Sequence, residues 1–235
     1  STCDGDCNDE NNLIRPNGID TLQDGIDQDC DGLDRERSIK AGGFHTCGIN
    51  EDGQLVCFGA KEDNVDYGQA LQVPNGNYVG LDAGLYHNCA ITPDSEVHCW
   101  GAGKTIGVEP HYGQSLVPLL ADVVKVSTGG YHSCALTVDQ DVTCWGALQV
   151  LAPTGPFVDI SLGWYHSCGL RPSGDVECWN DGMESRDVGQ FAIPQGISFR
   201  PIAAGAEHVC GLDDEGFVHC WGAGESDLGA APDFG

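Results

Sequence analysis

The stretch GGYHSCALTVDQDVTCWG, residues 129–146, contains two cysteines ten positions apart and ends on a tryptophan and a glycine. The same spacing recurs in four other places, and an aromatic residue follows the second cysteine every time. The five pairs are Cys47/Cys57, Cys89/Cys99, Cys134/Cys144, Cys168/Cys178 and Cys210/Cys220. Recurrence every 34 to 45 residues is typical of repeat proteins such as propellers and solenoids.

The segment between the two cysteines of a pair predicts a β-hairpin. If Cys134 faces Cys144 across two antiparallel strands, Leu136 lies opposite Val142 and the turn falls on residues 138–140. The other copies obey the same rule, with Ile49/Leu55, Ile91/Val97, Leu170/Val176 and Leu212/Val218. Because side chains alternate along a strand, the cysteines and these aliphatic residues share one face of the hairpin.

Opposed cysteines on adjacent strands are close enough to bridge, so we expect five disulfides: Cys47–Cys57, Cys89–Cys99, Cys134–Cys144, Cys168–Cys178 and Cys210–Cys220. Each should stabilise the fold by about 2–3 kcal/mol, because it closes a short loop in the unfolded chain. Zinc or redox dithiols are the competing interpretation. A structural zinc site needs four ligands in closely spaced pairs, which this spacing does not provide.

The sequence around each cysteine pair repeats as well. The first cysteine of each pair ends the motif GGFHTC, GLYHNC, GGYHSC, GWYHSC or the divergent GAEHVC. Between successive repeats, a proline-containing connection leads to a short apolar strand that ends in glycine. The histidines occur once per repeat: His45, His87, His132, His166 and His208. We expect them to be structural, each bonding a backbone carbonyl beneath its hairpin. A ring of imidazoles that binds a metal is the alternative.

The repeats share the consensus pattern G-x-x-H-x-C-x-L, then G-x-V-x-C-W-G, then G-Q, a proline and an apolar strand. Over residues 38–235 this pattern resembles the regulator of chromosome condensation (RCC1) repeat. It is most similar to the secreted bacterial branch of that family, in which cysteines staple the central hairpin. The resemblance implies an all-β fold, a β-propeller of five repeats, although the family usually builds seven blades. We expect the strand at 38–43 to complete the last blade and close a five-bladed ring; an open or partial propeller is the rival.

Residues 1–37 form a second, acidic module with 11 carboxylates and three arginines. Alternating oxygen-bearing side chains followed by glycine can fold around a hard cation such as calcium. The segment also resembles the Asp-rich metal-binding motif of secreted bacterial proteins. By that resemblance calcium would be held by Asp4, Asp6, Asn8, Asp27, Asp29 and Asp31, with Asp9, Asp20 or Asp24 as further candidates, and a Cys7–Cys30 disulfide would staple the module. A flexible acidic tail is the alternative.

The composition limits the classes of binding partner and indicates the compartment in which the chain folds. A net charge of −26 excludes nucleic acid and anionic lipid as partners, since both are bound mainly through lysine and arginine. Thirteen cysteines indicate an oxidising, extracellular or cell-surface location, and the odd Cys3 is a candidate for an intermolecular bond. Without a long apolar run we expect a soluble chain, and its start at Ser1 indicates a processed or partial chain.

Three functions remain open. The first is a non-enzymatic extracellular structural or adhesive module that self-associates or belongs to a larger surface or fibre protein. The second is a secreted protein binder or inhibitor that uses the loops 60–66, 102–111, 180–187 and 223–231. The third is a carbohydrate-active enzyme. The sequence contains no G-x-S-x-G, H-E-x-x-H or Walker motif, so we expect no catalytic residues.

Overall fold

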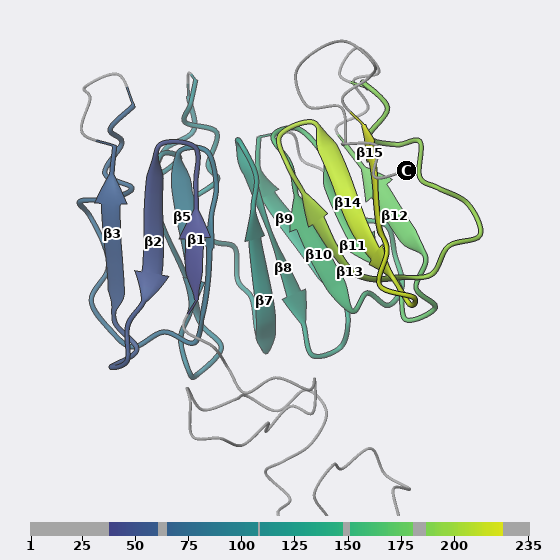
Figure 1. Cartoon of the computed structure of the whole chain (residues 1–235). Helices are drawn as coiled ribbons and strands as arrows, with labels where there is room; N and C mark the ends of the chain where they lie inside the picture. The colour runs from purple at the N-terminus through teal and green to yellow at the C-terminus, as the bar shows by residue number, and fades with distance from the viewer. Residues whose placement is uncertain (1–37, 61–64, 108, 148–150, 181–186, 223–235) are drawn as a thin grey trace, which may run out of the picture.

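The structure is a computed structural model that describes residues 38–60, 65–107, 109–147, 151–180 and 187–222. Five antiparallel sheets of three strands follow one another along this part of the chain (Figure 1). The first sheet contains β1 (Ile39–Ala41), β2 (His45–Ile49) and β3 (Leu55–Gly59). The second contains β4 (Gly80–Ala83), β5 (His87–Ile91) and β6 (Val97–Gly101), and the third β7 (Val123–Thr128), β8 (His132–Thr137) and β9 (Val142–Gly146). The fourth contains β10 (Asp159–Leu162), β11 (Ser167–Leu170) and β12 (Val176–Trp179), and the fifth β13 (Phe199–Ala204), β14 (His208–Asp213) and β15 (Val218–Gly222).

The hairpins have the predicted register. Cys134 lies opposite Cys144 and Leu136 opposite Val142 in the third sheet, and the four other hairpins repeat this pairing. The glycine after the aromatic residue is required by the backbone. Gly101, for example, has a positive φ of 101°, and a Cβ atom there would lie 2.6 Å from the carbonyl oxygen of Tyr86.

The predicted closure of the ring is wrong. Each short apolar strand pairs with the hairpin that follows it, so β1 is the inner strand of the first sheet and pairs with β2. It does not complete the fifth sheet, whose inner strand is β13. The connection from β1 to β2 covers only residues 42–44, which favours this local pairing. The five sheets therefore form an open arc, with the first and fifth sheets at its two ends (Figure 1).

Each sheet has two different faces. The cystine face carries the disulfide and the aliphatic pair, which in the third sheet are Cys134–Cys144 and Leu136/Val142. The aromatic face carries the residue after the second cysteine and the aliphatic side chain of the inner strand. At each of the four junctions between neighbouring sheets, the cystine face of one sheet packs on the aromatic face of the next.

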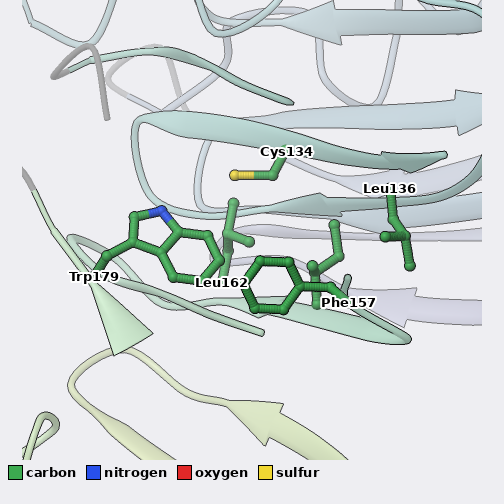
Figure 2. Packing of buried hydrophobic residues seen from close by; sticks show 6 residues of the cluster. Cys134, Leu136, Phe157, Leu162 and Trp179 are labelled. Carbon is green, nitrogen blue, oxygen red and sulfur yellow. The ribbon is translucent and has the colours of Figure 1, made fainter. Parts of the chain in front are cut away.

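The third junction illustrates this arrangement. Cys134 and Leu136 from the third sheet contact Phe157, Leu162 and Trp179 around the fourth sheet (Figure 2). The core is thus divided among the junctions, with one cluster at each of the four, rather than forming one central core. A fifth, smaller cluster contains Leu85, Tyr131 and Ala147. Within the described residues, a sheet at the end of the arc has only one of its faces covered by another sheet.

Candidate interaction surfaces

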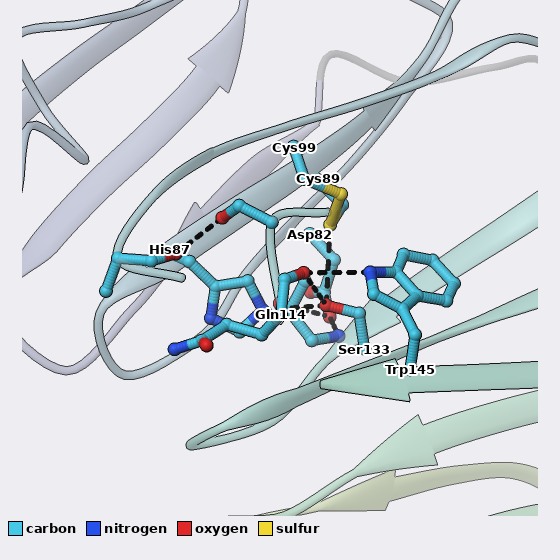
Figure 3. Close-up of a disulfide and its surroundings, with 10 residues drawn as sticks. Asp82, His87, Cys89, Cys99, Gln114, Ser133 and Trp145 are labelled. Atoms are coloured by element: carbon cyan, nitrogen blue, oxygen red, sulfur yellow. Dashed lines mark hydrogen bonds between the residues drawn. A yellow bond between two sulfur atoms is a disulfide. The ribbon is translucent and has the colours of Figure 1, made fainter. Parts of the chain in front are cut away.

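A buried hydrogen-bond chain crosses the second junction, beside the Cys89–Cys99 disulfide (Figure 3). The Nε2 atom of His87 lies 2.8 Å from the Oγ atom of Ser133, which belongs to the next sheet. Ser133 Oγ in turn donates to the carbonyl oxygen of Gln114 at 3.0 Å, and Trp145 Nε1 donates to the same oxygen at 2.9 Å. Because the serine proton is used in this bond, His87 must donate through Nε2.

The histidine bond recurs at the neighbouring junctions. His45 Nε2 lies 2.6 Å from Asn88 Oδ1, and His132 Nε2 lies 2.8 Å from Ser167 Oγ. The acceptor is in each case the residue directly after the histidine of the next repeat. At the first junction Asn88 and Trp100 also both donate to Gln69 O, whereas at the third Trp179 Nε1 is buried without a partner. For His45, His87 and His132 the predicted structural role is correct, but the predicted partner is wrong: their Nε2 atoms bond the side chain of the following sheet and not a backbone carbonyl.

Burial keeps these imidazoles neutral. Loss of solvation, with a smaller contribution from neighbouring histidines, lowers the pKa of His87 to about 3 and the pKa of His132 to about 4. Burial also lowers the pKa of His45. A neutral imidazole with one committed N–H is a structural joint and a poor proton shuttle.

The fourth junction lacks this bond. The residue after the fifth histidine is Val209, which has no acceptor, and His166 Nε2 is buried without a hydrogen-bond partner. Loss of solvation and the nearby His208 lower the pKa of His166 to about 4. The backbone contact survives, since Trp164 N donates to Ala206 O at 2.9 Å, as Gly43, Leu85 and Gly130 donate to the next sheet at the other junctions.

The inner strands line a hollow of about 610 Å³, and its polar side chains also connect neighbouring sheets. Asp82 Oδ2 accepts from the backbone N–H of Thr128 at 2.7 Å, and Ser161 Oγ accepts from that of Ala204 at 2.8 Å. Lys125 pairs with Asp159. Within the described residues, no group of three or more histidine, cysteine, aspartate or glutamate side chains could hold a metal ion.

No sheet in the described part of the chain covers the aromatic face of the first sheet. Ile39 is 75% exposed and Phe58 is 68% exposed, whereas their counterparts Leu81 and Trp100 in the second sheet are 5% and 2% exposed. An apolar hollow of about 160 Å³ lies on this face between Ile39, Val56 and Phe58. These exposed side chains belong to a junction that has only one half.

The cystine face of the fifth sheet is the other uncovered end. Val218 is 53% exposed, and Leu212 and Cys210 are half-buried although their counterparts in the four preceding sheets are buried. Sequence reasoning predicted the residues of both faces but missed that they are exposed. The sequence indicates this exposure only indirectly, because it follows from a repeat being at the end of a row that does not close.

The five predicted hairpin disulfides are all present, with Cα–Cα distances of 4.0 to 4.1 Å. Cys3, Cys7, Cys30 and all the predicted calcium ligands lie outside the described residues, so those predictions stand untested. Of the four predicted contact loops, most of 60–66 and 180–187 and all of 223–231 also lie outside them, whereas 102–111 is described except for residue 108. The described part of the chain includes no helix long and apolar enough to cross a membrane.

Comparison with known proteins places the described part among repeat proteins of the β-propeller type. The model of the regulator of chromosome condensation (RCC1) repeat matches residues 37–69, 123–147 and 157–179. A second model, described as "Putative metal-binding motif", matches residues 6–36. The chain therefore contains RCC1 repeats preceded by a metal-binding motif. A search of curated proteins finds no significant match.

Solved structures give the same fold. The CRINKLY WD40 ectodomain of the Arabidopsis thaliana receptor kinase ACR4 has a TM-score of 0.63 at 26% identity, over 79% of this chain and 64% of that chain. The ectodomain of the Physcomitrella patens receptor kinase CR4 has a TM-score of 0.62 at 26% identity, over 79% and 52%. Prp20p from Saccharomyces cerevisiae has a TM-score of 0.62 at 18% identity, over 79% and 57%. The chain spans less than two thirds of the length of each.

Proposed function

We propose that this protein is a non-enzymatic extracellular structural or adhesive module that self-associates or forms part of a larger surface or fibre protein. The observation that carries the proposal is the arc itself, a disulfide-stapled row of sheets with an uncovered apolar face at each end. Apolar patches of this kind on a folded protein mark interaction surfaces. Five disulfides fit an oxidising compartment.

The non-enzymatic half of the proposal is supported by what the reactive side chains do. All ten cysteines in the described ranges are bridged and cannot act as nucleophiles. His45, His87 and His132 are buried at junctions and hydrogen-bonded to the next sheet. Their chemistry is used to hold the sheets together.

We assign calcium to the acidic module, with Asp4, Asp6, Asn8, Asp27, Asp29 and Asp31 as ligands and Cys7–Cys30 as its staple. The matched family model supports a metal at residues 6–36, and carboxylate and amide oxygens are the ligands that calcium prefers. The assignment is tested by calorimetric titration of the full chain, stripped of metal with a chelator, first with calcium and then with copper(II) as the competing metal. An Asp27→Asn, Asp29→Asn variant should lose calcium binding, and tighter copper binding would contradict it.

The native mass tests the structural proposal. Light scattering of the non-reduced protein with calcium should give a mass above the 24.8 kDa of one chain, and chelator or reductant should lower it. A strict monomer under every condition would contradict the self-associating half of the proposal.

Binding of a foreign protein is the second candidate function. Two similar solved proteins favour it: Prp20p binds Gsp1p and histones, and yeast RCC1 has been solved bound to Kap60. The loops 60–66, 102–111, 180–187 and 223–231 would form the contact surface. Affinity capture from the native medium separates the two candidates, because one stoichiometric foreign partner favours the binder and recovery of this chain alone favours the structural module.

A further inference from the structure

We propose that the two uncovered ends of the arc bind each other between copies: the cystine face of the fifth sheet docks on the aromatic face of the first sheet of a second copy. This inference rests on the self-association in the proposed function and specifies its interface. The docking surface on one copy is formed by Cys210, Leu212 and Val218. The surface on the other is formed by Ile39, Val56 and Phe58.

The four junctions inside the chain show how such faces combine. At each of them a cystine face contacts an aromatic face, and no junction joins two faces of the same kind. At the first junction, Cys47 and Ile49 contact Leu81 and Trp100. In the two open faces, Cys210 and Leu212 correspond to Cys47 and Ile49, and Ile39 and Phe58 correspond to Leu81 and Trp100. The ends of the arc are therefore the two halves of one further junction.

The charges agree with this pairing. The chain has a net charge of −26, yet the open face of the first sheet is uncharged, with Ile39, Gly48 and Val56 in one row and Ala41, Thr46 and Phe58 in the next. The open face of the fifth sheet carries Ala203, Cys210 and Cys220 in one row and Leu212 and Val218 in the next. Arg200, at the irregular position of β13, adds a charge beside this face and forms an ion pair with Asp214 at 3.1 Å. The two faces can therefore meet without burying an unpaired charge.

The hydrogen-bond chain is also interrupted at these two ends. Among the described residues no sheet follows the fifth to accept from His208. In the first sheet, Thr46 occupies the acceptor position that Asn88, Ser133 and Ser167 fill at the inner junctions. Docking between copies would let His208 Nε2 donate to Thr46 Oγ1, as His87 donates to Ser133. The same partner surface would thus supply both the missing hydrogen bond and the missing apolar contacts.

The arc cannot form this contact with itself, because its two ends lie apart (Figure 1). The contact is therefore head-to-tail between copies. Repeated contacts of this kind generate an open helical row unless their rotation closes a ring.

Three single variants of the full chain test the docking by sedimentation velocity in calcium under non-reducing conditions. Phe58→Asp blocks the aromatic end, Val218→Asp blocks the cystine end, and Leu119→Asp is the control, since Leu119 is fully exposed and lies in the connection between the second and third sheets. Each end variant alone should sediment as a monomer, whereas the control should assemble like the wild type. An equimolar mixture of the two end variants should form a dimer that does not grow, because each contributes one intact face.

Circular dichroism and thermal unfolding confirm that the variants are folded, which their exposed positions favour. Dimers of Val218→Asp alone would indicate contact between two aromatic faces and would overturn the head-to-tail docking. Assembly that persists in both end variants but disappears with chelator would also overturn it, while leaving the proposed structural function intact. A wild type that is monomeric in every condition would contradict both. A His208→Ala variant should weaken assembly less than Val218→Asp, because it removes one hydrogen bond and no apolar cover.

Discussion

Trp100 and Phe58 occupy the same position in neighbouring sheets, directly after the second cysteine, but Trp100 is 2% exposed and Phe58 is 68% exposed. Their strands have the same register and the same disulfide. The difference arises because the first sheet packs on the aromatic side of the second, whereas no described sheet packs on the aromatic side of the first. In this fold, a residue at this position is buried only when a neighbouring sheet packs on the face that carries it.

The largest expected effect follows from that comparison. Trp145→Ala at the second junction should lower the free energy of unfolding by about 3–5 kcal/mol, because it leaves a cavity and removes the donor to Gln114 O. Phe58→Ala should cost less than about 0.5 kcal/mol in the isolated chain, as for other exposed positions. Guanidinium denaturation of dilute, non-reduced protein measures both. Equal losses would show that the first sheet is covered in solution.

The buried histidines make the inner junctions sensitive to acid. Their folded pKa values, about 3 for His87 and about 4 for His132 and His166, lie below the ordinary value of 6.5, so the unfolded chain binds protons first as the pH falls. Stability is therefore fully present above pH 6.5 and is lost on acidification towards pH 4. We expect each buried histidine to lower the free energy of unfolding by about 1–2 kcal/mol as the pH falls from 6.5 to about 5.

Denaturant midpoints at a series of pH values measure this loss. A His132→Gln variant keeps a donor for Ser167 and cannot titrate in this range, so its stability should fall less steeply with acid than that of the wild type. Identical slopes in the two proteins would show that the imidazoles do not carry the effect.

The disulfides allow the same comparison between the middle and the end of the arc. Replacing both cysteines of Cys134–Cys144 or of Cys210–Cys220 by alanine opens a loop of the same length, which should cost about 2–3 kcal/mol in either case. Cys134 is fully buried and Cys210 is half-buried, so the inner pair should cost about 1 kcal/mol more through the cavity it leaves. Thermal unfolding under non-reducing conditions tests the order, and a larger loss at Cys210–Cys220 would contradict it.

Much of each sheet could be predicted from the sequence because its contacts are local. The spacing of Cys134 and Cys144 sets the turn, the register and the face of Leu136 together. The strand at 38–43 was assigned to the wrong sheet, because a strand between two hairpins matches either one in pattern, and only the short connection 42–44 decides. The acceptors of the histidines lie 35 to 46 residues away, beyond any local pattern. The calcium ligands remain predictions.

The smallest effect comes from comparing the third and fourth junctions. At the third, His132 donates to Ser167; at the fourth, Val209 occupies the position of Ser167 and His166 Nε2 has no partner. Val209→Thr keeps the side-chain volume and supplies a hydroxyl that can accept from His166 and donate to Gln190 O, as Ser133 does to Gln114 O. Because a satisfied hydrogen bond contributes about 1 kcal/mol net, we expect a gain of that size.

The matched change at the third junction should have the opposite sign. Ser167→Val removes the acceptor of a buried N–H and should cost about 1–3 kcal/mol, the penalty of leaving a buried donor unsatisfied. Denaturant unfolding of both variants measures the pair. A loss of stability for Val209→Thr would mean that the added hydroxyl is itself unsatisfied at the fourth junction. The apolar contacts of Val209 with Cys168 and Leu170 would then contribute more than the hydrogen bond that the other junctions use.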